Sequence, residues 1–174
     1  MKLTQPVWPK FLPTRTVLAL ARLGPVGARL PAPGTWGSVA GLLYFTVFFF
    51  RLGTAETIVW SALACWLAVG ICGEAEFRLG KKDPGEVILD EFVVMPLCLL
   101  GWRSLATPAG PLPPWAVFLG ALALFRLFDI MKPFGIAKLQ DLPAGWGVVV
   151  DDVAAALATC ATMHAVHWMW LAMR

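Results

Sequence analysis

Charge is the scarcest property of this chain: only 14% of its 174 residues are Asp, Glu, Lys or Arg, against about 25% in a typical soluble domain. Hydrophobic residues make up 59%. A chain so poor in charge and so rich in apolar side chains is not typical of a soluble enzyme, and we expect an integral membrane protein. Its length suits one compact bundle without a second large domain.

Other absences exclude further classes of protein. All four cysteines lie in apolar segments, so neither a disulfide framework nor a zinc site is expected. No basic stripe is interleaved with exposed aromatic residues, so nucleic acid is not an expected partner. The sequence lacks a phosphate-binding P-loop, a G-x-S-x-G elbow and an H-E-x-x-H motif. Residues 1–33 are basic, broken by prolines and without the apolar core of a signal peptide.

Five apolar stretches are present, at roughly 36–50, 57–73, 87–102, 115–131 and 147–172. A full membrane span needs about 20 residues, so the first four require tilt, bilayer thinning or partial insertion. The stretch 87–102 is the weakest span, and we expect Pro96 to kink it. We predict an all-α fold, a polytopic membrane helix bundle with about four to five membrane-embedded helices. Residues 1–30 would form a basic N-terminal cytoplasmic arm, and residues 31–174 the membrane-embedded catalytic domain.

The distribution of Lys and Arg predicts the orientation of the bundle. The N-terminal arm and the connections 74–86 and 132–146 carry five, three and two basic residues, whereas 51–56 and 103–114 carry one each. The N-terminus and the two basic connections should therefore be cytoplasmic. On this topology the unusual polar residues all fall on the cytoplasmic side of the membrane.

Two acidic doublets stand inside or at the mouth of long apolar runs: Asp90-Glu91 and Asp151-Asp152. A charged side chain at the bilayer centre costs about 2.5–3.5 kcal/mol, so these carboxylates must be shallow, paired or bound to a cation. Two doublets on one membrane face suggest a divalent-metal site, because Mg²⁺ commonly takes carboxylates, waters and a substrate phosphate. The alternative is that each doublet complements the positive dipole at the start of its helix.

Three charged residues lie three apart in FRLFDIMKP: Arg126, Asp129 and Lys132. This spacing puts them on one helix face, where Asp129 can pair with either cation. One interpretation is a phosphate clamp, in which Arg126 grips oxygens and Lys132 adds a point charge. The other is a structural ion pair with a snorkelling lysine at the helix end.

The remaining polar residues of interest lie in two segments that are typical of helix starts. Asp83-Pro84-Gly85-Glu86 is typical of a helix start with Asp83 as the N-cap. PGTWGS at 33–38 combines glycines and hydroxyls where free backbone amides favour an anion. Its alternative interpretation is Thr35 as an N-cap, with Gly37 allowing close helix packing.

Four segments extend these patterns: PGTWGS at 33–38, KDPGEVILDEFV at 82–93, FRLFDIMKPFGI at 125–136 and GWGVVVDDVAAA at 145–156. With these segments in this order, the chain resembles phosphatidylglycerophosphatase A over most of residues 30–156. The resemblance implies a Mg²⁺-dependent, multi-pass enzyme of the bacterial inner membrane with its active site facing the cytoplasm. That enzyme removes the terminal phosphate of phosphatidylglycerophosphate to give phosphatidylglycerol. The chain departs from the family pattern at Val94, where Gly is usual, and at Phe134 and Gly135, where the family has Trp and Pro.

Together the residues and the resemblance define an expected site. The expected catalytic residues are Asp90, Glu91, Asp129 and Asp152. The expected substrate-binding residues are Thr35, Ser38, Arg126 and Lys132. The expected Mg²⁺ ligands are Asp83, Asp90, Glu91, Asp151 and Asp152.

The expected partners are the lipid substrate and the bilayer, and a homo-oligomer stays open. The competing function is a small cation carrier or channel that uses the intramembrane carboxylates.

Overall fold

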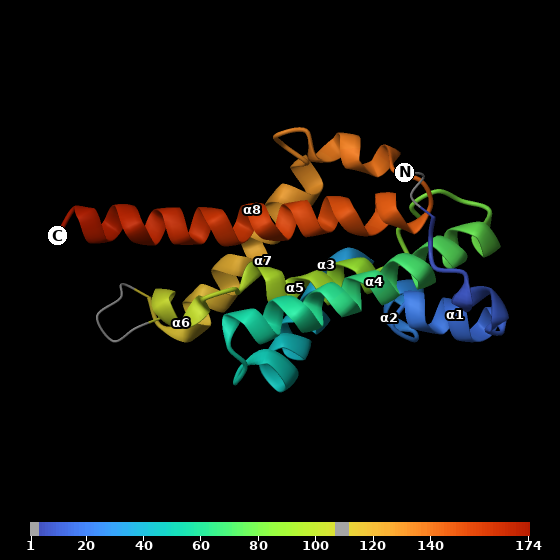
Figure 1. Cartoon of the computed structure of the whole chain (residues 1–174), viewed down its shortest axis with the longest axis horizontal. Coiled ribbons are helices and arrows are strands. Elements are labelled where there is room, and N and C mark those ends of the chain that lie inside the picture. The colour runs from blue at the N-terminus through green and yellow to red at the C-terminus, as the bar shows by residue number, and fades with distance from the viewer. Residues whose placement is uncertain (1–3, 107–111) are drawn as a thin grey trace.

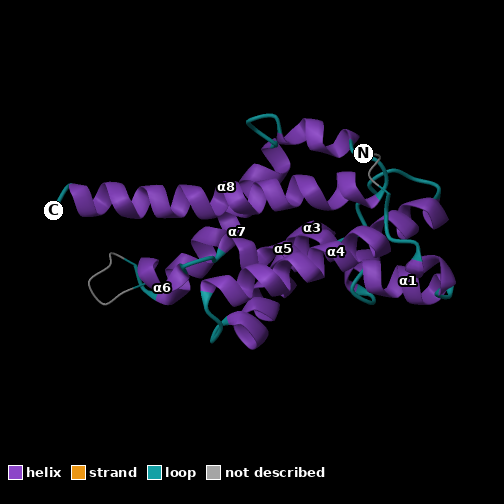
Figure 2. Ribbon diagram, viewed as in Figure 1, coloured by secondary structure: helices purple, strands orange, loops and turns teal. Residues whose placement is uncertain are grey.

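The computed structural model describes residues 4–106 and 112–174, and within these ranges the chain is helical without a β-strand (Figures 1 and 2). The main helices are α1 (Thr14–Ala21), α2 (Val26–Arg29), α3 (Pro33–Tyr44), α4 (Thr54–Leu79), α5 (Leu89–Cys98), α6 (Trp102–Leu105), α7 (Pro114–Met131) and α8 (Gly145–Ala172). Three short irregular helices are η1 (Trp8–Phe11), η2 (Phe45–Phe49) and η3 (Ile136–Asp141). The predicted all-α fold is confirmed.

Three helices of the described chain, α4, α7 and α8, are long and apolar enough to cross a membrane. The predicted stretch 36–50 lies in α3 and its continuation η2, and 87–102 contains the short helix α5, which ends two residues after Pro96. The ten residues of α5 rise about 15 Å, which is about half of a hydrocarbon core. This helix therefore cannot cross a bilayer by itself.

Helix α5 is nevertheless the centre of the bundle. It packs against α3, α4 and α8, and its residues Val94 and Met95 are fully buried. Figure 1 shows α8 running along the length of the molecule, with α7 crossing it. The start of α5, which carries Asp90 and Glu91, is thereby held among three other helices.

The described part of the predicted N-terminal arm is packed onto the body of the protein. In α1, Val17 and Ala21 are fully buried, and α1 packs against α4. Arg78 of α4 donates a hydrogen bond to the carbonyl oxygen of Pro9 at 3.2 Å. Residues 4–30 are therefore integrated with the bundle. Lys2, and residues 107–111 of the connection 103–114, lie outside the described residues.

Neither the predicted N-cap at Asp83 nor the alternative one at Thr35 is present. Asp83 has a left-handed backbone (φ +45°), whereas an N-cap needs an extended one. The N–H of Val87 closes a turn onto the carbonyl oxygen of Pro84 at 2.8 Å, and α5 begins only at Leu89. In α3 the first position is taken by Pro33, whose missing N–H is not needed there. Thr35 therefore lies inside the helix.

The start of α8 meets α4 backbone to backbone. A Cβ atom at Gly145 would overlap the carbonyl oxygen of Val69 and lie 2.7 Å from the backbone nitrogen of Gly73. Such close approach is typical of small residues between membrane helices. It brings the acidic doublet of α8 toward the centre of the bundle.

We predict that Gly145→Ala destabilises the fold by about 1–3 kcal/mol, because it overpacks this contact. The thermal unfolding midpoint in detergent measures the effect. Gly120 in α7 has no atom within 4 Å of its Cβ position, so Gly120→Ala is the matched control and should be nearly neutral. Equal midpoints for the two variants would contradict the packing described here.

Candidate functional site

A cavity of about 310 Å³ gathers six carboxylates from α5, α7, α8 and the loop that precedes α5. They belong to Asp83, Asp90, Glu91, Asp129, Asp151 and Asp152. Lys132 and Gln140 also line the cavity. The structure thus brings together all the predicted catalytic and metal-binding residues, although they come from distant parts of the sequence.

Arg126 connects two of these carboxylates. Its Nη1 donates to Oε1 of Glu91 at 2.8 Å and to Oδ2 of Asp129 at 2.7 Å. The predicted pairing of Arg126 with Asp129 is confirmed, and the bond to Glu91 also links α7 to α5. Arg126 does not line the cavity itself, but it fixes two residues that do.

Lys132 pairs with a different acid from the expected one. Its ammonium donates to Oδ2 of Asp151, not to Asp129 in its own segment. Helix α7 ends at Met131, and Lys132 takes a left-handed backbone (φ +43°) that removes it from the helix face of Asp129. Burial lowers the pKa of Lys132, but the hydrogen bond to Asp151 outweighs this effect and the pKa is raised. Lys132 is therefore a cation in the cavity.

Several carboxylate oxygens in this cavity lack partners. Oε2 of Glu91, Oδ1 of Asp151 and Oδ2 of Asp152 are buried without a hydrogen bond. Burial raises the pKa of Glu91 to about 7, although Arg126 opposes this. A buried acceptor without a partner is costly, and hard cations prefer carboxylate oxygens of this kind.

The cavity fits Mg²⁺ by its donor chemistry. As the side chains of the described residues lie, however, no three Asp, Glu, His or Cys groups are close enough together to hold an ion. Side-chain rotation toward a common point would be needed for binding. The unpartnered oxygens of Glu91, Asp151 and Asp152 are the ones available to an ion.

Two glycines at the start of α3 make room for Glu91. A Cβ atom at Gly34 would overlap Oε1 of Glu91, and one at Gly37 would lie 2.6 Å from Oε2. Sequence reasoning gave Gly37 a packing role and assigned neither glycine to the site. Their three-residue spacing, which places both on one helix face, was the available signal.

The two predicted hydroxyl ligands of α3 do not line the cavity. Thr35 is exposed. Ser38 is buried, and its hydroxyl donates to the carbonyl oxygen of Gly34 at 2.9 Å. A substrate-binding role for Thr35 and Ser38 stays a prediction.

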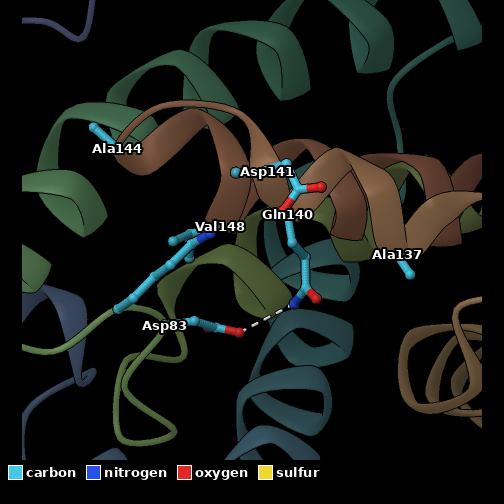
Figure 3. A pocket seen from close by; sticks show the side chains of 8 residues that line it. Asp83, Ala137, Gln140, Asp141, Ala144 and Val148 are labelled. Atoms are coloured by element: carbon cyan, nitrogen blue, oxygen red, sulfur yellow. Dashed lines mark hydrogen bonds between the residues drawn. The ribbon is translucent and has the colours of Figure 1, made fainter.

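Gln140 is a cavity residue that sequence reasoning missed. Its Nε2 donates to Oδ2 of Asp83 at 3.2 Å, as the dashed line in Figure 3 shows. The contact borders a second cavity of about 240 Å³, which shares Asp83, Gln140 and Val148 with the first. No local pattern marks Gln140, because its position depends on η3 packing against Gly147 of α8. A Cβ atom there would lie 2.7 Å from the carbonyl oxygen of Gln140.

Several known proteins have sequences similar to that of this chain. The family described as Phosphatidylglycerophosphatase A matches residues 19–167. A phosphatidylglycerophosphatase A of Haemophilus influenzae is 36% identical over 141 residues, which cover 80% of this chain and 82% of the relative. The phosphatidylglycerophosphatase A of Escherichia coli K12 is 26% identical, with 78% and 76% covered.

A third relative carries a different name. A Bacteroides thetaiotaomicron protein, provisionally named a phosphatidylinositol-3-phosphatase, is 32% identical over 144 residues, which cover 79% of this chain and 85% of the relative. No solved structure matches the chain.

We predict that Gly34→Ala displaces Glu91 from Arg126 and destabilises the protein by about 1–3 kcal/mol. The thermal midpoint in detergent measures this loss. Gly85→Ala is the control, because Gly85 lines the same cavity but has no atom within 4 Å of its Cβ position. If the clash is with Glu91, Gly34→Ala should cost little in a Glu91→Ala background. An unchanged cost there would contradict the proposed contact.

Proposed function

Since the chain belongs to the phosphatidylglycerophosphatase A family, we propose that it hydrolyses the terminal phosphate of phosphatidylglycerophosphate to phosphatidylglycerol, with Mg²⁺, at the cytoplasmic face of the bacterial inner membrane. Family membership makes the chain a lipid phosphatase, a phosphoric monoester hydrolase. Three apolar helices suit it to a membrane. The proposal rests on one observation. A single cavity contains Lys132 and carboxylates bound by Arg126, next to carboxylate oxygens that have no hydrogen-bond partner.

The ion would be held among the carboxylates predicted as its ligands: Asp83, Asp90, Glu91, Asp151 and Asp152. Three of these offer buried oxygens without a partner. When bound, Mg²⁺ would polarise the phosphate and lower the pKa of a bound water.

The two cations of the site would bind the phosphate. The ammonium of Lys132 has three donors, one of which is used by Asp151, so the others can reach phosphate oxygens. The Nε–H of Arg126 is buried without a partner, and Asp129 and Glu91 hold the guanidinium in place. Both cations would stabilise the charge that develops on the oxygens as the P–O bond breaks.

Two routes for this hydrolysis are compatible with the residues of the cavity. Water can attack phosphorus directly, or a carboxylate can first form an aspartyl-phosphate. Trapping of a phosphoenzyme would distinguish the second route from the first.

A cytoplasmic orientation is supported by the basic residues around the site end of the bundle. Helices α1 and α2 lie at the end of the molecule where α8 begins, away from its C-terminus (Figure 1). They carry Arg15 and Arg29, and Arg22 follows α1 directly. The predicted opposite side has Arg51 and Arg103. Excess Lys and Arg in short connections is typical of the cytoplasmic side.

We expect the purified protein to release phosphate from phosphatidylglycerophosphate in mixed micelles with Mg²⁺ and to stop when the ion is chelated. Phosphatidylinositol 3-phosphate, suggested by the name of the Bacteroides relative, is the comparison substrate. No release from phosphatidylglycerophosphate with any divalent ion would overturn the proposed reaction. Faster release from the inositol lipid would change the proposed substrate.

Glu91→Gln and Asp152→Asn should each lower Mg²⁺-dependent phosphate release by about a hundredfold or more, because each removes a charge from the reacting centre. The thermal midpoint should show that both variants remain folded. Glu86→Gln is the matched control, since Glu86 pairs with Arg22 and does not line the cavity. Full activity of both site variants would refute the metal assignment.

Lys132→Met should lower kcat/KM by about tenfold to a hundredfold, as expected for the loss of a hydrogen bond to a charged group. Steady-state kinetics on the lipid substrate measure this change. The exposed Lys138 of η3 gives the control Lys138→Met, which should retain kcat/KM. An unchanged kcat/KM for Lys132→Met would remove Lys132 from the proposed phosphate clamp.

A further inference from the structure

The turn that follows α7 has an unusual residue at its tip. The N–H of Ile136 donates to the carbonyl oxygen of Pro133 at 3.1 Å, and the two residues between them, Phe134 and Gly135, have φ of +58° and +84°. Positive φ at both central positions is the pattern of a type I′ turn, which favours Asn, Asp and Gly. A bulky side chain is rare in this backbone region. The local backbone therefore does not account for phenylalanine at position 134.

Burial does not account for Phe134 either. Its side chain is 89% exposed, and the neighbouring Ile130 and Met131 are 71% and 66% exposed. Ile130 also lines the cavity that holds the carboxylates. Ile130 thus brings exposed apolar surface to the edge of the charged site, near the end of a helix that can span a membrane. A strained, exposed residue in such a position points to a functional role.

The negative charge of the cavity opposes the binding of a phosphate, so the substrate needs favourable contacts outside the cavity. Six carboxylates line it, and its two nearby cations, Lys132 and Arg126, are already paired with three of them. Even with one Mg²⁺ bound among these carboxylates, as proposed above, their six negative charges outnumber the positive charges of the ion, Lys132 and Arg126. A phosphate monoester therefore meets a surface with more negative than positive charge. Binding energy from parts of the substrate remote from the phosphate can compensate for such an unfavourable approach.

We propose that Ile130, Met131 and Phe134 form an apolar lip that holds the acyl chains of the substrate while its phosphate enters the cavity. This inference rests on the proposed function and assigns the residues that recognise the acyl chains of its substrate. The lip selects diacyl lipid phosphates resident in the membrane over water-soluble phosphate monoesters with the same headgroup. Its apolar side chains contact lipid chains through the hydrophobic effect, and they take no part in the bond-breaking step.

The test compares two substrates and two matched variants of the full chain in mixed micelles. The substrates are long-chain phosphatidylglycerophosphate and a short-chain, water-soluble analogue with the same headgroup. Phe134→Asn removes the aromatic ring and suits the turn, so the thermal midpoint should not fall. Phe77→Asn is the control, because Phe77 is 80% exposed on α4 and borders a different cavity. Met131→Ser is a second variant of the lip, because Met131 is exposed and does not line the cavity.

We expect Phe134→Asn to raise KM for the long-chain lipid about tenfold, as the loss of one buried aromatic contact would. The kcat and the rate on the short-chain analogue should stay unchanged, and Met131→Ser should act in the same direction. Phe77→Asn should alter neither substrate. Equal losses on both substrates, or no loss on either, would overturn the lip. A wild-type protein that hydrolyses both substrates equally well would also overturn it, whereas one that hydrolyses no lipid phosphate would refute the proposed function itself.

Discussion

The burial of several carboxylates around one cavity is the constraint on which the rest of the structure depends. Asp90, Asp151 and Asp152 are each at most 5% exposed, and isolated charges in such places are costly. Arg126 joins carboxylates on α5 and α7, and Lys132 joins the end of α7 to α8. The same two cations therefore hold the helices together, and Lys132 also lines the cavity where a phosphate would bind. Carboxylate oxygens that remain unpaired in this arrangement are the natural ligands of a divalent ion.

The site also depends on glycines that permit close contacts and on one residue with a left-handed backbone. Gly34 and Gly37 let Glu91 lie against the start of α3, and Gly145 lets α8 meet α4. The left-handed backbone at Lys132 ends α7 and allows its ammonium to reach Asp151. Because Gly34, Gly37 and Gly145 have no room for a Cβ atom, a single added methyl group there would disturb the charged residues that they position. The same few residues thus determine both the packing of the helices and the placement of the charged groups.

Local spacing predicted part of this arrangement, and tertiary packing decided the rest. The helical fold and the pairing of Arg126 with Asp129 follow from apolar runs and from a three-residue repeat. The pairing of Lys132 with Asp151 does not, because it needs a helix to end between Asp129 and Lys132 and another helix to lie beside it. The predicted cap at Asp83 failed since a left-handed backbone there delays α5 to Leu89. Contacts such as that of Asp83 with Gln140, 57 residues apart, leave no local pattern in the sequence.

The central claim is that acids from α5 and α8 share one cation site, and Mn²⁺ binding measured by electron paramagnetic resonance tests it directly. Mn²⁺ prefers the same oxygen ligands as Mg²⁺ and reports its own bound fraction. The wild-type protein should bind Mn²⁺, Glu91→Gln and Asp152→Asn should each abolish that binding, and the double variant should lose no more than either single one. Absence of binding by the wild-type protein, or separate and additive losses in the two variants, would contradict a shared site.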